Sequence, residues 1–207
     1  MIVAALLYPA LAGARSKKLA AVDLYCDQLK SEFRETVPIV FSGPDPWVEI
    51  DDAGAVLRDE AIAYVYAEGS IIRWVVLVLD GSRNNWVQTV NYYFREDGML
   101  AKRERFLESR AANVDFEQIS YFENGRVVKN QSHHHALDSG REDKNRLDDP
   151  NAPLYLSTDE LPFPETPDYR RQLARLPERI SPGKCAPRRY VLWDPARRPM
   201  DDSPQKD

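Results

Sequence analysis

The sequence predicts an α+β fold in which an N-terminal helix packs on a curved antiparallel β-meander of about six or seven strands. Near the N-terminus, apolar residues recur every three or four positions, and from Trp47 onward they alternate with polar residues between glycine turns. Eleven of the 15 prolines fall at or after Pro150, which bounds the domain. We therefore predict one compact domain, 15–138, and a Pro-rich, basic, mostly irregular extension, 139–207, that packs on it or is partly disordered.

The predicted helix covers residues 16–36, SKKLAAVDLYCDQLKSEFRET. Its apolar side chains form one stripe at helical spacing: Leu19, Val22, Cys26, Leu29 and Phe33. Pro38 ends the helix because proline lacks the amide hydrogen that a helix interior needs. The apolar stripe must be buried, so we expect the helix to lie against the sheet that follows.

Asp-Gly and Asn-Gly turns divide the next part of the chain into segments of strand length, and their short connections imply antiparallel neighbours. The predicted strands are 47–50, 56–67, 71–79, 86–95, 99–107, 114–122 and 126–135. Segment 71–79, IIRWVVLVL, is apolar on both faces except at Arg73, which predicts a central strand. Segment 99–107 carries four charged residues in a row, Lys102 to Arg105, which predicts an outer or solvent-facing strand.

Aromatic residues concentrate on the predicted strands 71–79 and 86–95. The candidate ligand-binding residues are Trp74, Trp86, Tyr92 and Phe94. On a curled sheet such residues can line an apolar groove for a lipid or another small molecule. The alternative, which we favour for the cluster, is core packing against helix 16–36.

All three histidines of the chain are consecutive, in the stretch SHHHA. On a strand, His133 and His135 share a face and His134 points to the other, so the first two could bind one metal ion. A third ligand would have to be a carboxylate such as Asp138, Asp115 or Glu117. The simpler alternative, which we favour, is the polar end of a strand.

Several classes of function are disfavoured by the motifs that the sequence lacks. It contains no Gly-x-Ser-x-Gly elbow, no phosphate-binding Gly-rich loop followed by Lys-Ser or Lys-Thr, and no Gly-x-Gly-x-x-Gly fingerprint. We therefore predict no cofactor, and binding rather than catalysis. The net charge of −5 gives the whole molecule no general attraction to nucleic acid.

The first 14 residues, MIVAALLYPALAGA, contain no charged side chain. This run is too short to span a bilayer, but it resembles the apolar region of a secretory signal, with Ala12-Gly13-Ala14 as the cleavage site. The usual basic residues before the apolar run are missing. We expect a periplasmic or secreted protein; a buried N-terminal segment in a cytoplasmic protein is the alternative.

Export would allow the two cysteines, Cys26 and Cys185, to form a disulfide that ties the C-terminal extension to the helix. The alternative is that Cys26 is a small buried apolar residue. The extension is also basic: residues 170–198 hold nine Lys or Arg against two acids, a formal charge of +7. The remainder is then −12, so this segment either folds onto the acidic body or docks on an acidic partner.

Residues 121–128, YFENGRVV, resemble a single unit of the bacterial repeats that read Tyr-x-Glu-Asn-Gly. One helix followed by a long meander is also similar to α+β folds whose curved sheet grips a helix, including periplasmic lipid-carrier half-barrels; this implies a fold, not a function. The leading hypothesis is an exported, non-enzymatic domain that binds an apolar small molecule or an envelope protein. The alternatives are a metal-dependent hydrolase using His133 and His135, and a structural interaction protein with a basic docking tail.

Overall fold

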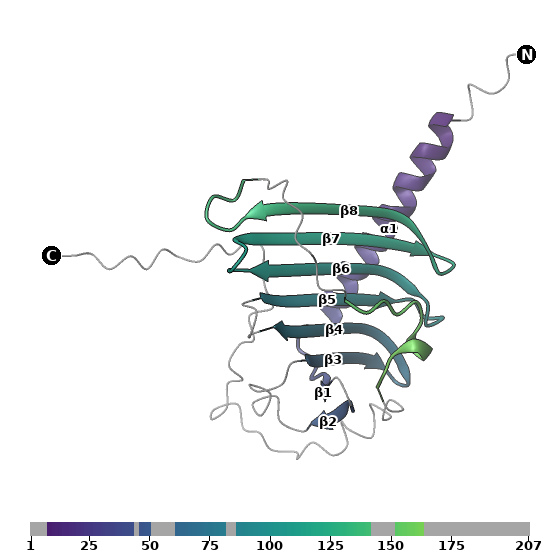
Figure 1. The fold of residues 1–207 in the computed structure, drawn as a ribbon. Helices are drawn as coiled ribbons and strands as arrows, with labels where there is room; N and C mark the ends of the chain where they lie inside the picture. Colours follow the sequence, from purple (N-terminus) through teal and green to yellow (C-terminus); the bar gives the residue numbers. More distant parts are fainter. Residues whose placement is uncertain (1–7, 44–45, 51–60, 82–85, 142–151, 164–207) are drawn as a thin grey trace, which may run out of the picture.

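A computed structural model of the chain describes residues 8–43, 46–50, 61–81, 86–141 and 152–163, with side chains described from Ser16 onward. These residues form one long helix, α1 (Tyr8–Glu32), and one eight-stranded antiparallel sheet (Figure 1). The strands are β1 (Ile39–Gly43), β2 (Val48–Ile50), β3 (Ala61–Glu68), β4 (Ile71–Gly81), β5 (Trp86–Phe94), β6 (Leu100–Ser109), β7 (Val114–Glu123) and β8 (Arg126–Ala136).

The strand order is β2-β1-β3-β4-β5-β6-β7-β8, so from β3 onward every strand pairs with its neighbours in sequence. This confirms the predicted helix and antiparallel meander. Glycines mark most of the turns, and the β6–β7 turn, which has none, falls in the predicted polar break. At Asn124-Gly125 both residues have positive φ, 49° and 70°, as a two-residue hairpin turn requires.

Three elements differ from their predicted bounds. The helix begins at Tyr8 and ends at Glu32, short of the predicted 36, and its first turns extend past the sheet (Figure 1). Strand β1 was not predicted from the sequence; it has five residues, begins directly after Pro38 and pairs with both β2 and β3. It is too short to show a clear alternation. The predicted residues 56–60 lie outside the described part, as do 1–7 of the candidate signal and the basic segment 170–198.

The position predicted for strand 99–107 is wrong. Strand β6 is not at an edge but lies between β5 and β7, and Lys102, Glu104 and Arg105 are each only 6% exposed. Their charges are tolerated because oppositely charged or polar groups from other elements reach them. The central position of 71–79 is confirmed, since β4 lies between β3 and β5 and its side chains are buried on both faces.

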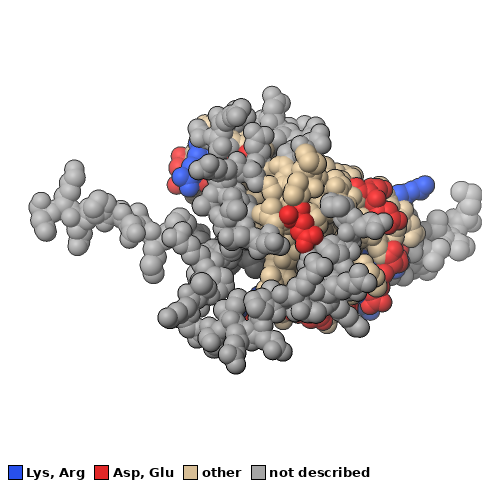
Figure 2. All heavy atoms as spheres, turned by 90° about the horizontal axis from the view of Figure 1, so that it is seen from below, with Lys and Arg blue, Asp and Glu red and all other residues tan. Residues whose placement is uncertain are grey.

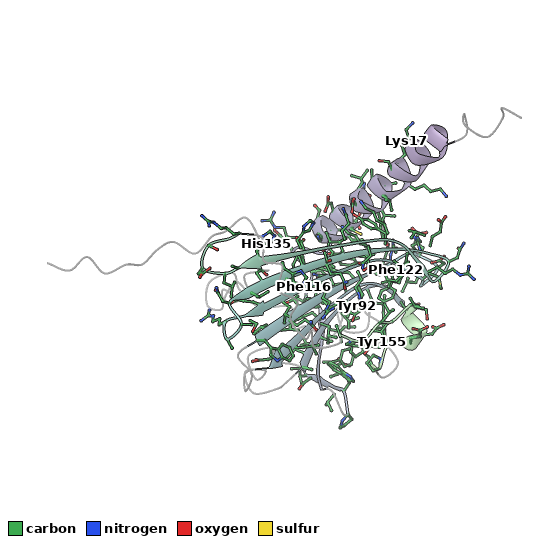
Figure 3. The ribbon with its side chains drawn as sticks, turned by 45° about the horizontal axis from the view of Figure 1, so that its top comes forward. Lys17, Tyr92, Phe116, Phe122, His135 and Tyr155 are labelled. Carbon is green, nitrogen blue, oxygen red and sulfur yellow. The ribbon has the colours of Figure 1, made fainter. Side chains whose placement is uncertain are left out.

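The helix lies over part of one face of the sheet, and residues 152–163 lie over part of the other (Figure 3). On the helix face, Cys26 and Leu29 of α1 pack against Trp74, Val76 and Tyr93 of β4 and β5. On the other face, a larger apolar core forms beneath residues 152–163, which we call the strap. This strap face includes these fully buried side chains: Phe41, Val65, Val75, Leu77, Val90, Tyr92, Phe94 and Leu100.

The strap is tied to the β5–β6 turn by its backbone. The amide of Leu100 donates to the carbonyl of Leu156 at 2.9 Å, and the amide of Thr158 donates to the carbonyl of Gly98 at 2.9 Å. Gly98 has a φ of +76°, and a Cβ there would lie 2.8 Å from the Thr158 hydroxyl. Glycine therefore serves both the turn and the close approach of the strap. In the described part of the chain, no helix is long and apolar enough to cross a membrane.

Candidate functional site

A network of charged and phenolic side chains lies between α1 and the sheet. The ammonium of Lys102 contacts Asp23 at 2.7 Å and Glu104 at 2.8 Å. The hydroxyl of Tyr93 donates to Glu104 at 2.7 Å, and Lys30 of α1 reaches the same carboxylate at 3.2 Å. Because each buried charge has an opposite charge beside it, the network can be buried without leaving an unpaired ion.

These contacts hold the network in one protonation state. Burial alone would raise the pKa of Glu104, but Lys30 and Lys102 outweigh it and the pKa is lowered. Burial likewise opposes the charge of Lys102, yet Glu104 and Asp23 raise its pKa. Burial raises the pKa of Cys26 to about 12, so its thiol stays protonated. A general acid or base works best with a pKa near the operating pH, and these groups are shifted away from it. The network is better suited to anchoring the helix than to catalysis.

A second anchor lies near the β5–β6 turn. Arg73 contacts Glu68 at 2.9 Å and donates to the hydroxyl of Tyr25, which itself donates to the carbonyl of Phe94. A groove of about 460 Å³ opens beside it. Its lining consists of Ala21, Val22, Tyr25, Arg95, Glu96, Asp97 and Ala101. Figure 2 shows acidic side chains in the middle of the visible face and along its right-hand edge. This groove is wide open, so a ligand there would remain largely in water.

A smaller cleft of about 210 Å³ opens on the helix face, over strands β4 to β7. Its lining residues are Val76, Val87, Thr89, Asn91, Phe106, Glu108 and Asp115. Val76 also packs in the core beneath α1, so the cleft continues from the helix–sheet interface. Val87 is 46% exposed, so part of the apolar lining faces solvent.

Two polar groups of the cleft, the amide of Asn91 and the carboxyl of Asp115, are partly or largely buried. Asn91 is 9% exposed, and its side-chain oxygen accepts a hydrogen bond from Trp74 Nε1 at 3.2 Å, which leaves its amide nitrogen for the cleft. The pKa of Asp115 is raised, first by burial; His135 opposes this, whereas Glu108 and Glu117 add to it. The acidic wall therefore attracts a cation or a hydrogen-bond donor.

The histidines lie where the alternation predicts. His133 pairs with Glu117 and His135 pairs with Asp115 across β7 and β8, and the two imidazole ring centroids are 6.3 Å apart. His134 is on the other face, with its ring 4.6 Å from that of Phe116. Figure 3 shows His135 at the end of the sheet away from Lys17. Asp138 follows β8 in a turn, where its amide donates to Asn113. In the described ranges, no group of three or more His, Cys, Asp or Glu side chains could hold a metal ion in the positions they occupy.

The four aromatic candidates do not line one groove. Trp74 is beneath the helix, stacked on Tyr66 at 4.5 Å, as the core-packing alternative predicts. Tyr92 and Phe94 belong to the opposite face, where the ring of Tyr155 from the strap lies 5.5 Å from that of Tyr92. Trp86 lies at the end of β5, where its indole would collide with any Cβ at Gly81. Tyr92 and Phe94 are thus core residues too, but they pack against the strap and not the helix.

The cysteine prediction is tested only in part. Cys26 is fully buried between α1 and the sheet, as expected for a small apolar residue. Cys185 lies outside the described residues, so the pairing stays a prediction.

The cleft residues Thr89, Asn91, Phe106 and Glu108 were not predicted from the sequence. A signal was present, because Thr89 and Asn91 are polar and fall on the same face of one strand. A polar pair on a buried face predicts a functional or hydrogen-bonded position.

Comparisons with protein-family models, with curated proteins and with solved structures give no match. The function is therefore inferred from the geometry alone.

Proposed function

We propose that this protein is a non-catalytic binding domain whose cleft over β4 to β7 takes a small molecule with an apolar body and a positively charged or hydrogen-bond-donating head. The observation that carries the proposal is the composition of this cleft. Apolar side chains such as Val87 and Phe106 lie beside the buried amide of Asn91 and the carboxylate of Asp115. Ligand sites typically combine such an apolar surface with a few fixed polar groups.

The strap face is a less suitable ligand site than the cleft on the helix face. There the aromatic residues that could have formed a groove are already covered, because Tyr92 donates to the carbonyl of Pro153 and Phe163 stacks on Phe41 at 4.9 Å. A ligand on that face would have to displace the strap, whereas the cleft on the helix face is open.

The size and the charge of the cleft narrow the ligand class. At about 210 Å³ it is smaller than the roughly 300–1,000 Å³ of drug-sized pockets, so the body of the ligand is about the size of one aromatic ring. Glu108 and Asp115 at its wall, with Glu117 next along β7, favour a cationic head. Phenethylamine is a suitable probe, and 2-phenylethanol is its uncharged counterpart.

Titration of isotope-labelled protein with both probes, followed by NMR, tests the proposal. We expect saturable shifts at Thr89 and Phe106, and tighter binding of the amine than of the alcohol. Thr89→Phe should abolish binding of both because the new ring fills the cleft. Asp115→Asn should weaken the preference for the amine. Glu96→Gln, in the separate groove beside Tyr25, is the matched control and should change nothing. Binding that survives Thr89→Phe would refute the proposed site.

We also propose that the chain is exported. The support is the uncharged run of residues 1–14, which ends in small residues before Arg15. N-terminal sequencing of the protein isolated from its native cell should begin at Arg15 if the signal is removed. A mature protein that begins at Met1 would contradict cleavage at this point.

A further inference from the structure

We propose that the β7–β8 hairpin binds one divalent transition-metal ion, such as Zn²⁺, through His133, His135 and a carboxylate from Asp115 or Glu117. This site would lie beside the proposed small-molecule cleft, with Asp115 bordering both. The inference rests on the pairing of the two strands, on the chemistry of the four side chains, and on what does and does not hold those side chains in place.

The strand register brings the four side chains to one patch. Asp115 faces His135 and Glu117 faces His133 in successive cross-strand pairs, all on the helix face of the sheet. Directly opposite residues have Cβ atoms about 4.5–5.5 Å apart, and residues two apart on one strand are separated by roughly 7 Å. The backbone therefore holds two imidazoles and two carboxylates at the corners of a small rectangle.

The donor set suits a borderline divalent ion. Imidazole nitrogen and carboxylate oxygen are both ordinary zinc ligands, at about 2.0–2.2 Å, and two histidines with one carboxylate complete a three-ligand site that leaves a position open. Glu108 and Glu117 both act on the carboxylate of Asp115, and a cation beside these groups would offset their negative charge. Arg110 contacts Glu108 at 3.1 Å and already offsets part of that charge.

The side chains must turn to converge on one point, because they do not do so at present. None of the four side chains is fully buried. His133 is exposed, and Glu117, Asp115 and His135 are intermediate in exposure. Their side chains make no hydrogen bond or salt bridge with another described residue, and the main contact of the histidines is with each other, at 6.3 Å between centroids. Only side-chain rotation is needed, because the strand pairing is already in place.

The three consecutive histidines supply their own control. Untagged full-length protein at pH 7.5 would be titrated with Zn²⁺ by calorimetry, together with His133→Ala, His134→Ala, His135→Ala and Glu117→Gln. We expect one ion per chain, and a loss of affinity of at least about tenfold for His133→Ala and His135→Ala, since loss of a direct ligand should cost no less than loss of a supporting group. His134→Ala should bind like the unmodified protein, because His134 is on the other face against Phe116.

The opposite results would overturn the proposal. Equal weakening by His134→Ala would mean that the histidine tract binds metal without regard to the strand geometry. No saturable binding with Zn²⁺ up to about 100 µM would mean that the site does not exist at useful affinity. Thr89→Phe, which fills the small-molecule cleft, should leave Zn²⁺ binding unchanged, so the two proposals can fail independently. Comparing the Zn²⁺ affinities of the single variants Glu117→Gln and Asp115→Asn shows which carboxylate is the third ligand.

Discussion

On the strap face most buried side chains are apolar, and the buried guanidinium of Arg105 lies over the ring of Phe116; on the helix face the buried charges are paired with opposite charges. Phe41, Val65 and Phe94 are fully buried in the core beneath the strap. Lys102 and Glu104, nearly as deeply buried, owe their burial to partners on α1 and on β5. The comparison shows that the two faces of one sheet can be buried differently, one mainly by apolar packing and the other by apolar packing together with pairs of opposite charges.

The two ways have different physical consequences. Apolar burial is non-directional, so the strap needs only a few backbone hydrogen bonds to fix its position. Charge pairing depends on geometry, so the network beneath α1 determines where the helix sits along the sheet. The strap face should therefore contribute more to stability, and the helix face should respond more to pH and to single charge changes.

The largest expected effect comes from the strap face. Phe94→Ala removes a fully buried ring whose centroid lies 6.5 Å from that of Tyr92, and we expect a loss of about 3–5 kcal/mol in the free energy of unfolding, because a cavity is left. Urea denaturation measures it. Val127→Ala, at a side chain that is 54% exposed, is the control and should stay within about 0.5 kcal/mol. Equal losses would mean that the strap face is not the main core.

A smaller loss is expected from the helix face. Lys102→Met leaves Asp23 and Glu104 without their shared cation, and we expect about 2–3 kcal/mol, less than for an isolated buried pair because Lys30 still reaches Glu104. Lys18→Met is the matched control: it breaks an exposed pair with Glu123 and should cost under about 1 kcal/mol. If Glu104→Gln added to Lys102→Met fails to recover any stability, the cost is one of packing and not of charge.

The pH dependence should separate the two faces further. Since the pKa of Glu104 is lower in the folded protein than in the unfolded chain, its contribution to stability is fully present above the ordinary glutamate pKa, about 4.3. That contribution is lost as the pH falls through and below this value. Urea midpoints at pH 7 and pH 3 should therefore differ less in Glu104→Gln than in the unmodified protein. An identical acid dependence of the two proteins would contradict this role for Glu104.

The smallest expected effect concerns the reactivity of Cys26 and not stability. With its pKa raised to about 12 by burial beneath α1, the thiol should not react with an alkylating reagent at pH 8 in folded Cys185→Ser protein, and should react on unfolding. Mass spectrometry measures the labelling. Rapid labelling of folded protein would show that α1 leaves the sheet easily. The mass of the unmodified protein before reduction also tests the predicted disulfide.

Predictions from the sequence were confirmed where a feature depends only on residues close together along the chain. The stripe from Val22 to Phe33 predicted which side of the helix packs on the sheet, and the period of two predicted that His133 and His135 share a face. They failed where distant residues decide. The charged residues of β6 predicted an outer strand because their partners on the helix, Asp23 and Lys30, are distant in the sequence and their pairing with β6 could not be foreseen.

The sequence by itself determined the helix, the antiparallel pairing and most of the turns, because these depend on periodicity and on residues such as Gly125 that are adjacent along the chain. Only the tertiary structure decided which face each core residue serves. The register shift after Tyr66 places both Arg73 and Trp74 on the helix face, which strict alternation forbids. The cleft and the paired charges have the same origin: they exist only once four strands and one helix, each specified locally, are brought together in space.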